Sequence, residues 1–108
     1  MGLDASVYRD DDEEDPIASV RLGNIALIFY LFEAISKKTP NARILLTKVL
    51  YSGSHCGDWL TTEEARQVKR ELDEVSQTIN GDMEVEAFIS RFRGIVDVAL
   101  QNDRPITF

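Results

Sequence analysis

The segment from Thr61 to Ile79 carries the clearest secondary-structure signal in the chain. Thr61 and Glu64 occupy the two positions of a capping box, in which each side chain binds a backbone N–H at the start of a helix. Apolar residues then recur at spacings of three and four, which places them on one side of a helix: Ala65, Val68, Leu72, Val75 and Ile79. The opposite side is charged. This segment therefore predicts an amphipathic helix packed on a core.

A second helix is predicted over Met83–Asn102, after the helix-ending pair Asn80-Gly81. Asp82 can cap its first turn. Its predicted apolar face consists of Phe88, Phe92, Ile95, Val96 and Ala99. Gly94 costs about 1 kcal/mol relative to alanine inside a helix. We therefore expect this glycine to permit a close crossing with another element.

The N-terminal part of the chain predicts a β-hairpin. Apolar and polar residues alternate over Leu3–Tyr8 and again over Ile17–Leu22, which is typical of half-buried strands. The segment between them, Arg9–Pro16, is a run of charged residues. The two strands should pair antiparallel with an acidic loop at the tip.

A buried helix is predicted over Ile25–Lys38, with Asn24 as its N-cap and a stop at Thr39-Pro40-Asn41. Its apolar residues cover nearly all sides, so we expect it to be deeply buried. A strand is the alternative, because Ile, Phe and Tyr are frequent, but the length favours a helix. The longest apolar run, Ile25–Ile35, is interrupted by Glu33 and is shorter than the about 20 residues that a bilayer span needs.

Two further strands complete the prediction. Ile44–Tyr51 is apolar on both faces except at Thr47 and Lys48, which predicts a central strand. Arg104–Phe108 predicts a short final strand, where Pro105 is tolerated near the start. We expect one α+β domain over residues 1–108, in the order β-β-α-β-α-α-β. A small mixed or antiparallel sheet should pack against three helices.

Negative charge is concentrated in one short segment. The net charge is −7, and Met1–Asp15 contains seven of the 19 acidic residues but one of the 12 basic residues. The remainder holds 12 acidic and 11 basic residues and is almost neutral. Six consecutive acids form most of the predicted loop: Asp10, Asp11, Asp12, Glu13, Glu14 and Asp15. Such a segment repels nucleic acids and anionic membranes and suits a basic protein surface.

The acidic loop has two interpretations. Adjacent carboxylates can imitate a phosphate backbone and steer a basic cleft, such as that of a nuclease, toward the loop. Alternatively, the loop is only a solvated segment that aids solubility. The sequence favours neither interpretation.

The segment from His55 to Trp59 is the second candidate binding site. Trp59 is the single tryptophan of the chain, and tryptophan is frequent among residues that dominate binding energy at interfaces. We favour the alternative that Trp59 packs on the first turn of the following helix as a hydrophobic staple. His55 and Asp58 are further candidates for contacts with a partner.

Few residues are suited to catalysis. His55 and Cys56 are the single histidine and cysteine, and side chains of consecutive residues usually diverge. Cys56 precedes a predicted helix, which can lower a thiol pKa, but a small buried thiol is the favoured interpretation. No zinc, calcium or phosphate-binding motif is present. We expect no enzyme activity, metal or cofactor. The lone cysteine and the absence of a signal-peptide pattern predict a cytoplasmic protein.

Three short stretches carry a resemblance to a known family: Met1–Tyr8, the loop Ser52–Trp59 before the capped helix, and the ending Pro105–Phe108. They resemble small immunity proteins of bacterial polymorphic toxin and contact-dependent inhibition systems. One such family has a Ser-x-Cys-x-Gly-x-Trp-like loop before a helix rich in Glu and Leu, and a final Pro-Ile-x-Phe. This chain has His55 where an acidic residue is common, and its Gly57-Asp58 order differs. The resemblance implies stoichiometric inhibition of a toxin in the cytosol, without identifying the toxin.

The function expected from these observations is that of an immunity protein that occludes the active site of a cognate toxin domain, such as a nuclease. The candidate partner-binding residues are the acidic loop Asp10–Asp15 together with His55, Asp58 and Trp59. A protein-binding adaptor or regulatory module would use the same surfaces and is the first alternative. A thiol-dependent enzyme using Cys56 is the second. The oligomeric state is not predicted.

Overall fold

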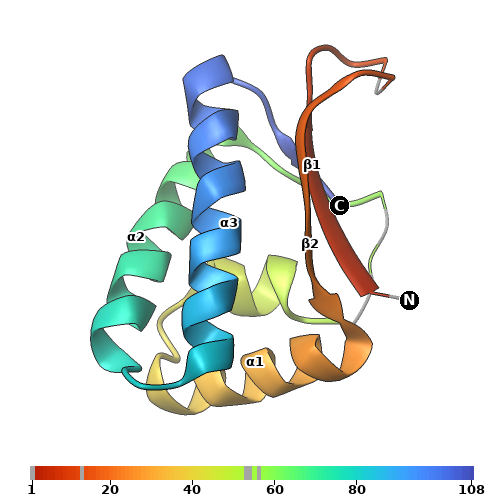
Figure 1. Cartoon of the computed structure of the whole chain (residues 1–108). Helices are drawn as coiled ribbons and strands as arrows, with labels where there is room; N and C mark the ends of the chain where they lie inside the picture. Colours follow the sequence, from red (N-terminus) through yellow and green to blue (C-terminus); the bar gives the residue numbers. More distant parts are fainter. Residues whose placement is uncertain (1, 13, 53–54, 56) are drawn as a thin grey trace.

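A four-stranded sheet, in the order β2-β1-β4-β3, and three α-helices make up the computed structural model (Figure 1). All strand pairs are antiparallel. The structure describes residues 2–12, 14–52, 55 and 57–108. The elements are β1 (Gly2–Tyr8), β2 (Pro16–Asn24), α1 (Ile25–Lys38), the short helix η1 (Leu45–Val49), β3 (Trp59–Leu60), α2 (Thr62–Thr78), α3 (Met83–Asn102) and β4 (Ile106–Thr107). The predicted α+β class is confirmed.

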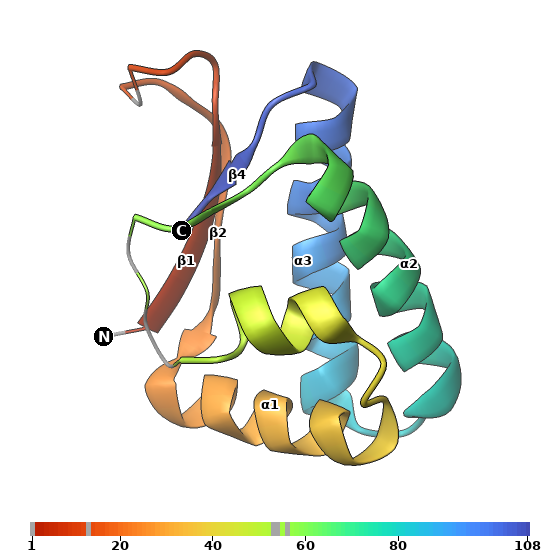
Figure 2. The ribbon, with the colours of Figure 1, turned by 180° about the vertical axis from the view of Figure 1, so that it is seen from behind.

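The helices lie on one side of the sheet. Helices α2 and α3 pack against each other beside the sheet, and α1 crosses beneath one end of them (Figures 1 and 2). The inward residues of β1, which are Leu3, Ala5 and Val7, are buried in the core. They alternate with the more exposed Asp4, Ser6 and Tyr8. The sheet therefore has one covered face and one open, largely polar face.

The predicted hairpin is confirmed. Strand β1 pairs with β2 from Gly2 opposite Asn24 to Tyr8 opposite Pro16. The register shifts once near each end of the pair, between Leu3 and Asp4 and between Val7 and Tyr8. The acidic loop is consequently carried at the end of a long two-stranded ribbon, visible at the top of Figure 1.

The three predicted helix starts are also confirmed. The Asn24 side chain accepts from the Leu27 N–H at 2.8 Å, and Asp82 accepts from the N–H groups of Glu84 and Val85. Both hydrogen bonds of the Thr61–Glu64 capping box are formed. The five apolar residues predicted for the segment Thr61–Ile79 and the five predicted for α3 are all buried.

Two expectations about helix packing are wrong. In α1, Ile28, Leu31 and Ile35 are fully buried, but Phe29 is 56% exposed and Tyr30 is 47% exposed. Because α1 lies across the end of the other layers, one side of it faces solvent. Gly94 of α3 does not mark a close crossing either, since a Cβ added there would meet no atom within 4 Å.

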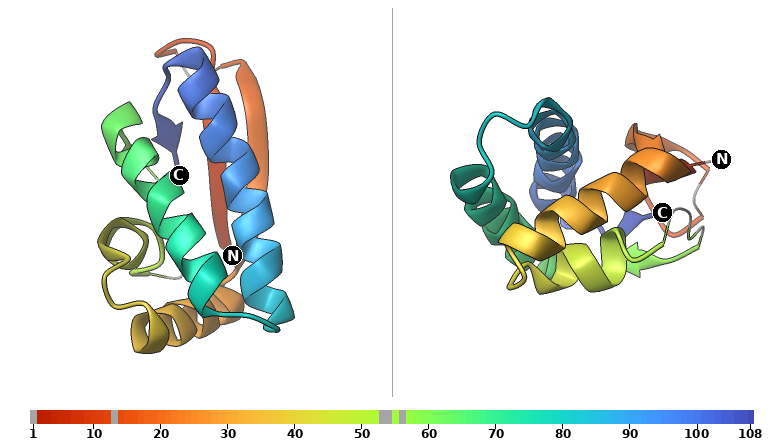
Figure 3. Two further views of the ribbon diagram at one scale, coloured as in Figure 1. Left: turned by 90° about the vertical axis from the view of Figure 1, so that its left-hand side faces the viewer. Right: turned by 90° about the horizontal axis from the view of Figure 1, so that it is seen from below.

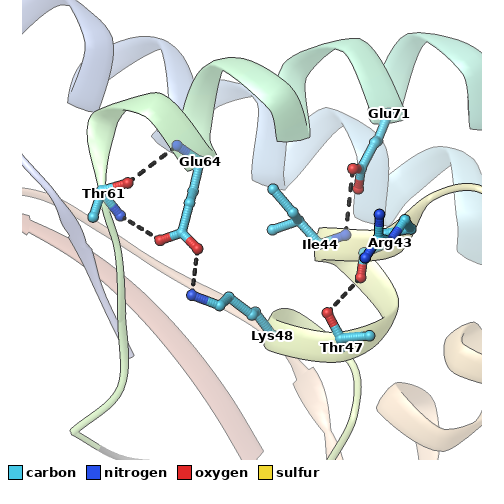
Figure 4. A network of polar contacts seen from close by, with 7 residues as sticks. All are labelled: Arg43, Ile44, Thr47, Lys48, Thr61, Glu64 and Glu71. Carbon is cyan, nitrogen blue, oxygen red and sulfur yellow. Dashed lines mark hydrogen bonds and ion pairs between the residues drawn. The ribbon is translucent and has the colours of Figure 1, made fainter.

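The predicted central strand Ile44–Tyr51 is wrong as well, because η1 forms there. Leu45 and Val49 are buried and lie about one helical turn apart. The buried Glu71 carboxylate of α2 accepts from the N–H of Leu45 at 2.9 Å and of Ile44 at 3.3 Å (Figure 4). An acceptor at these free N–H groups stabilises a helix start. The strand between the first and second α-helices is β3 instead.

No helix among the described residues is both long enough and apolar enough to cross a membrane.

We predict that Glu71→Ala lowers the free energy of unfolding by about 2–3 kcal/mol, because two backbone donors then lose a buried, charged acceptor. Urea unfolding measures this loss. Glu74→Ala, an exposed position on the same helix, is the matched control and should change stability by less than about 0.5 kcal/mol. Equal effects of the two substitutions would contradict the role assigned to Glu71.

Candidate protein-interaction face

Trp59 belongs to a row of side chains that crosses the open face of the sheet. Ser19 of β2 is opposite Ser6 of β1, Ser6 is opposite Thr107 of β4, and Thr107 is opposite Trp59 of β3. Residues directly opposite each other in a sheet point to the same face. Tyr8 lies two positions beyond Ser6 and therefore points to that face too.

The expected staple role of Trp59 is wrong, because its side chain is 63% exposed. Trp59 instead lies between two shallow hollows. The helix-side hollow has a volume of about 400 Å³ and is lined by Thr47, Lys48, Tyr51, Asp58, Trp59, Thr61 and Glu64. The loop-side hollow has a volume of about 270 Å³ and is lined by Tyr8, Asp11, Trp59, Arg104, Pro105 and Thr107. One exposed indole is thus shared by two concave sites.

An ion pair between Lys48 of η1 and Glu64 of α2 spans the helix-side hollow (Figure 4). Glu64 also accepts from the backbone N–H of Thr61 at 3.0 Å. Burial alone would raise the pKa of the Glu64 carboxyl, but the hydrogen bonds from Lys48 and Thr61 outweigh burial and lower it. The ionised capping box therefore fixes one wall of the hollow.

The other wall is formed by Tyr51 and Asp58. The Tyr51 hydroxyl donates to the Asp58 carboxylate, and this hydrogen bond raises the pKa of Tyr51. The His55 ring stacks on the Tyr51 ring with centroids 4.7 Å apart. The His55 and Phe108 rings meet edge to face, with centroids 4.8 Å apart. Asp58 itself is exposed, so it can reach a bound partner.

His55 was expected to contact a partner, but it lies in the interior, with a side chain only 4% exposed. Its Nε2 lies 2.7 Å from the Val49 carbonyl oxygen, which can only accept, so Nε2 carries a proton and donates. Its Nδ1 lies 3.2 Å from an Asp58 carboxylate oxygen, within ion-pair distance but outside hydrogen-bond geometry. His55 is thus nearly covered by its contacts with Tyr51 and Phe108, although it lines a further hollow beside Ser6 and Thr107.

The loop-side hollow contains an arginine that connects the acidic loop to the sheet. Arg104 donates from Nε to the Tyr8 carbonyl oxygen at 3.0 Å and from Nη2 to Asp11 at 2.9 Å. The Arg104 side chain is 23% exposed, whereas that of Asp11 is 94% exposed. Arg104 therefore positions the loop beside Trp59.

The acidic loop remains negative after its internal contacts are counted. Asp15 pairs with Arg9 at 3.0 Å, and Asp11 pairs with Arg104. The exposed Asp10, Asp12 and Glu14 form no ion pair within the part of the chain that the structure describes. The Asp12 N–H donates to Asp10 at 3.1 Å, which turns the loop at its tip. Glu13 lies outside the described residues.

Cys56, the candidate nucleophile, also lies outside the described residues. Within residues 2–12, 14–52, 55 and 57–108, no three His, Cys, Asp or Glu side chains are grouped to hold a metal ion.

Comparison of the chain with protein-family models, with curated protein sequences and with solved structures found no match.

The structure brings Trp59, Asp58 and Asp11 to one face and leaves the His55 side chain almost fully buried. Sequence reasoning missed most of the residues that line the hollows, among them Tyr8, Tyr51 and Arg104. The alternation of β1 already put Tyr8 on the polar face, which was a usable signal. Nothing local distinguishes Arg104, because its partners Tyr8 and Asp11 lie more than 90 residues away in the sequence.

We predict that Lys48→Gln reduces the loss of stability in acid. Because the folded-state pKa of Glu64 is lowered from 4.5, its stabilising effect is complete above about pH 4.5 and is lost as the pH falls through the folded value. Removing Lys48 removes part of that shift. The free energy of unfolding at pH 7 should fall by at most about 1 kcal/mol, since the lysine is half exposed, and the variant should lose less than the wild type on acidification.

Lys37→Gln serves as the control, because its ion pair with Glu33 is about 70% exposed on both sides. Urea unfolding at neutral and acidic pH compares the variants. Identical pH profiles for Lys48→Gln and the wild type would contradict the coupling between Lys48 and Glu64.

Proposed function

We propose that this protein is a cytoplasmic immunity protein that binds a basic toxin domain and occludes its active site. The main observation in support of this proposal is that Trp59 and Asp11 line the same hollow. Tryptophan often contributes much of the binding energy at protein interfaces, and here Trp59 lies beside the carboxylate-rich loop. The resemblance to small immunity proteins in three short stretches supports the same proposal.

The two parts of this face have separate roles in the proposal. Unpaired carboxylates at the loop tip attract a cationic partner over long range and accelerate association. Trp59 and the two hollows beside it provide the contact that slows dissociation. A nuclease fits this division, since its cleft is basic and is shaped to receive a row of phosphates.

Internal contacts reduce the cost of ordering the loop. Arg9 and Arg104 each hold one of its carboxylates, and Arg104 also holds the end of β1. A loop that is already positioned loses less conformational entropy when it binds. The same two arginines leave at least three carboxylates available, so the loop is positioned without being neutralised.

The direct test is co-expression with the toxin domain encoded by the neighbouring gene. A complex that persists at micromolar concentration, with stoichiometric loss of toxin activity, is the expected result. If no neighbouring gene product binds at that concentration, the proposal fails.

We predict that Trp59→Ala weakens binding of the toxin domain by about 30-fold or more, because a central tryptophan typically contributes about 2 kcal/mol or more. Isothermal titration calorimetry measures the dissociation constant. Phe29→Ala is the matched control, since Phe29 is similarly exposed at 56% but lies on α1. If Phe29→Ala weakens binding and Trp59→Ala does not, the binding face has been misplaced.

We also predict that the double variant Asp10→Asn with Asp12→Asn slows association and flattens its dependence on salt, because it removes long-range attraction. Stopped-flow measurements at several ionic strengths give the rates. Glu74→Gln with Glu86→Gln removes the same charge from exposed positions on α2 and α3. Equal effects of the two double variants would show that only net charge matters and would exclude a specific role for the loop.

A further inference from the structure

The nine-residue strand β2 forms one outer edge of the sheet. In the left view of Figure 3 the upper part of this strand lies at the margin of the molecule, and no strand of the described sheet lies beyond it. An edge strand presents unpaired N–H and C=O groups along its length, and such groups form hydrogen bonds with another strand when one is available. The outer edge of β2 is therefore a surface that the proposed toxin-binding face does not use.

The middle of this edge has regular geometry. Residues Ala18, Ser19, Val20 and Arg21 pair with β1 in unbroken register, and the two irregularities lie beyond them. Two features that hinder pairing with another strand lie near the ends of β2. Pro16 is at the start, and near the other end Arg91 of α3 donates to the Leu22 carbonyl oxygen at 3.1 Å. The stretch 18–21 is left open between them.

The two ends of β2 differ in charge, and this difference favours pairing with the same strand of a second copy. The strand begins at the acidic loop and ends at Asn24, the N-cap of α1. Helix α1 has no acidic residue in its first turn, so its positive end is capped by the neutral Asn24 side chain and by no negative charge of that turn. When two identical strands pair antiparallel, the start of each lies beside the end of the other. The acidic loop of one copy would then lie near the helix start of the other, at both ends of the pair.

We propose that the outer edge of β2 binds the same edge of a second copy of this chain, forming a two-fold dimer with a continuous eight-stranded antiparallel sheet. The two-fold axis passes through the sheet at Ser19 or Val20. In either register a lysine placed at position 19 would face a positive charge across the two-fold axis. With the axis at Ser19, the two substituted positions face each other. With the axis at Val20, position 19 of each copy faces Arg21 of the other copy.

This dimer leaves Trp59, Asp11 and the two hollows accessible, although it engages Glu14 at the margin of the acidic loop. Asp11 lies on the side of the loop that contacts Arg104 and Trp59, whereas Glu14 lies next to the start of β2. Strand β3, which carries Trp59, is at the opposite edge of the sheet from β2. Each dimer therefore presents two copies of the face, and failure of one proposal does not entail failure of the other.

Sedimentation equilibrium from about 1 µM to about 1 mM tests the dimer over a range that covers weak self-association. The expected result is a monomer–dimer equilibrium that Ser19→Lys weakens by about fivefold or more, because like charges then face each other across the axis. Ser6→Lys is the matched control. Ser6 hydrogen-bonds to Ser19 at 2.9 Å on the same face but lies one strand away from the edge, so it should leave the equilibrium nearly unchanged.

A second pair of variants keeps the test decisive if a lysine disturbs the fold. Glu14→Gln should weaken the dimer and reduce its sensitivity to salt, whereas Asp10→Asn, in the same loop, should not. Amide hydrogen exchange in residues 16–24 should slow as the protein concentration rises. A protein that stays monomeric up to about 1 mM, or a dimer in which exchange within β2 is unchanged, would overturn the proposal.

Discussion

The buried carboxylate of Glu71 is the interaction on which the arrangement of the candidate interaction face depends. It holds the first N–H groups of η1 against the middle of α2, 26 and 27 residues further along the chain. Burial of a charged group is unfavourable unless hydrogen bonds satisfy it, and two backbone donors and the Gln67 amide do so here. With η1 fixed, Lys48 reaches Glu64 (Figure 4), and Tyr51 is placed at the entry to the segment that leads to Trp59.

Most of the fold is predictable where the signal is local. Caps at Asn24, Thr61 and Asp82, together with helical spacing, gave three helices with correct starts, and alternation gave the hairpin. The prediction was wrong at Ile44–Tyr51, where a short apolar run suits a buried strand as well as a buried helix. The deciding contact there comes from Glu71, which counts as an ordinary charged residue of α2 until the two segments are placed together. Tertiary contact of this kind overrides local preference.

The candidate site was predictable only in part. Exposure of Asp58 and the projection of the acidic loop follow from residue type and position, whereas exposure of Trp59 does not, because an apolar residue before a helix cap favoured a packed staple. Their proximity does not follow either, because it requires β4 to lie between β1 and β3. For the same reason the sequence suggested a surface role for His55, whereas its ring fills the space between Tyr51 and Phe108. The two arginines that position the loop differ in how far they lie from their partners along the sequence. Arg9 is adjacent to its partner in the hairpin, but Arg104 comes from the other end of the described chain.

The place of β4 in the sheet has a consequence for the order in which the parts of the fold come together during synthesis. This strand follows every other strand and helix in the chain, yet it forms the only link between β1 and β3 in the described sheet. The ribosome therefore releases the hairpin and all three helices before the tryptophan can be joined to the carboxylate loop. Folding domains can gain helices and hairpins early, but long-range strand pairing comes late. The row of side chains that joins Trp59 to the hairpin therefore forms only after the other elements are in place.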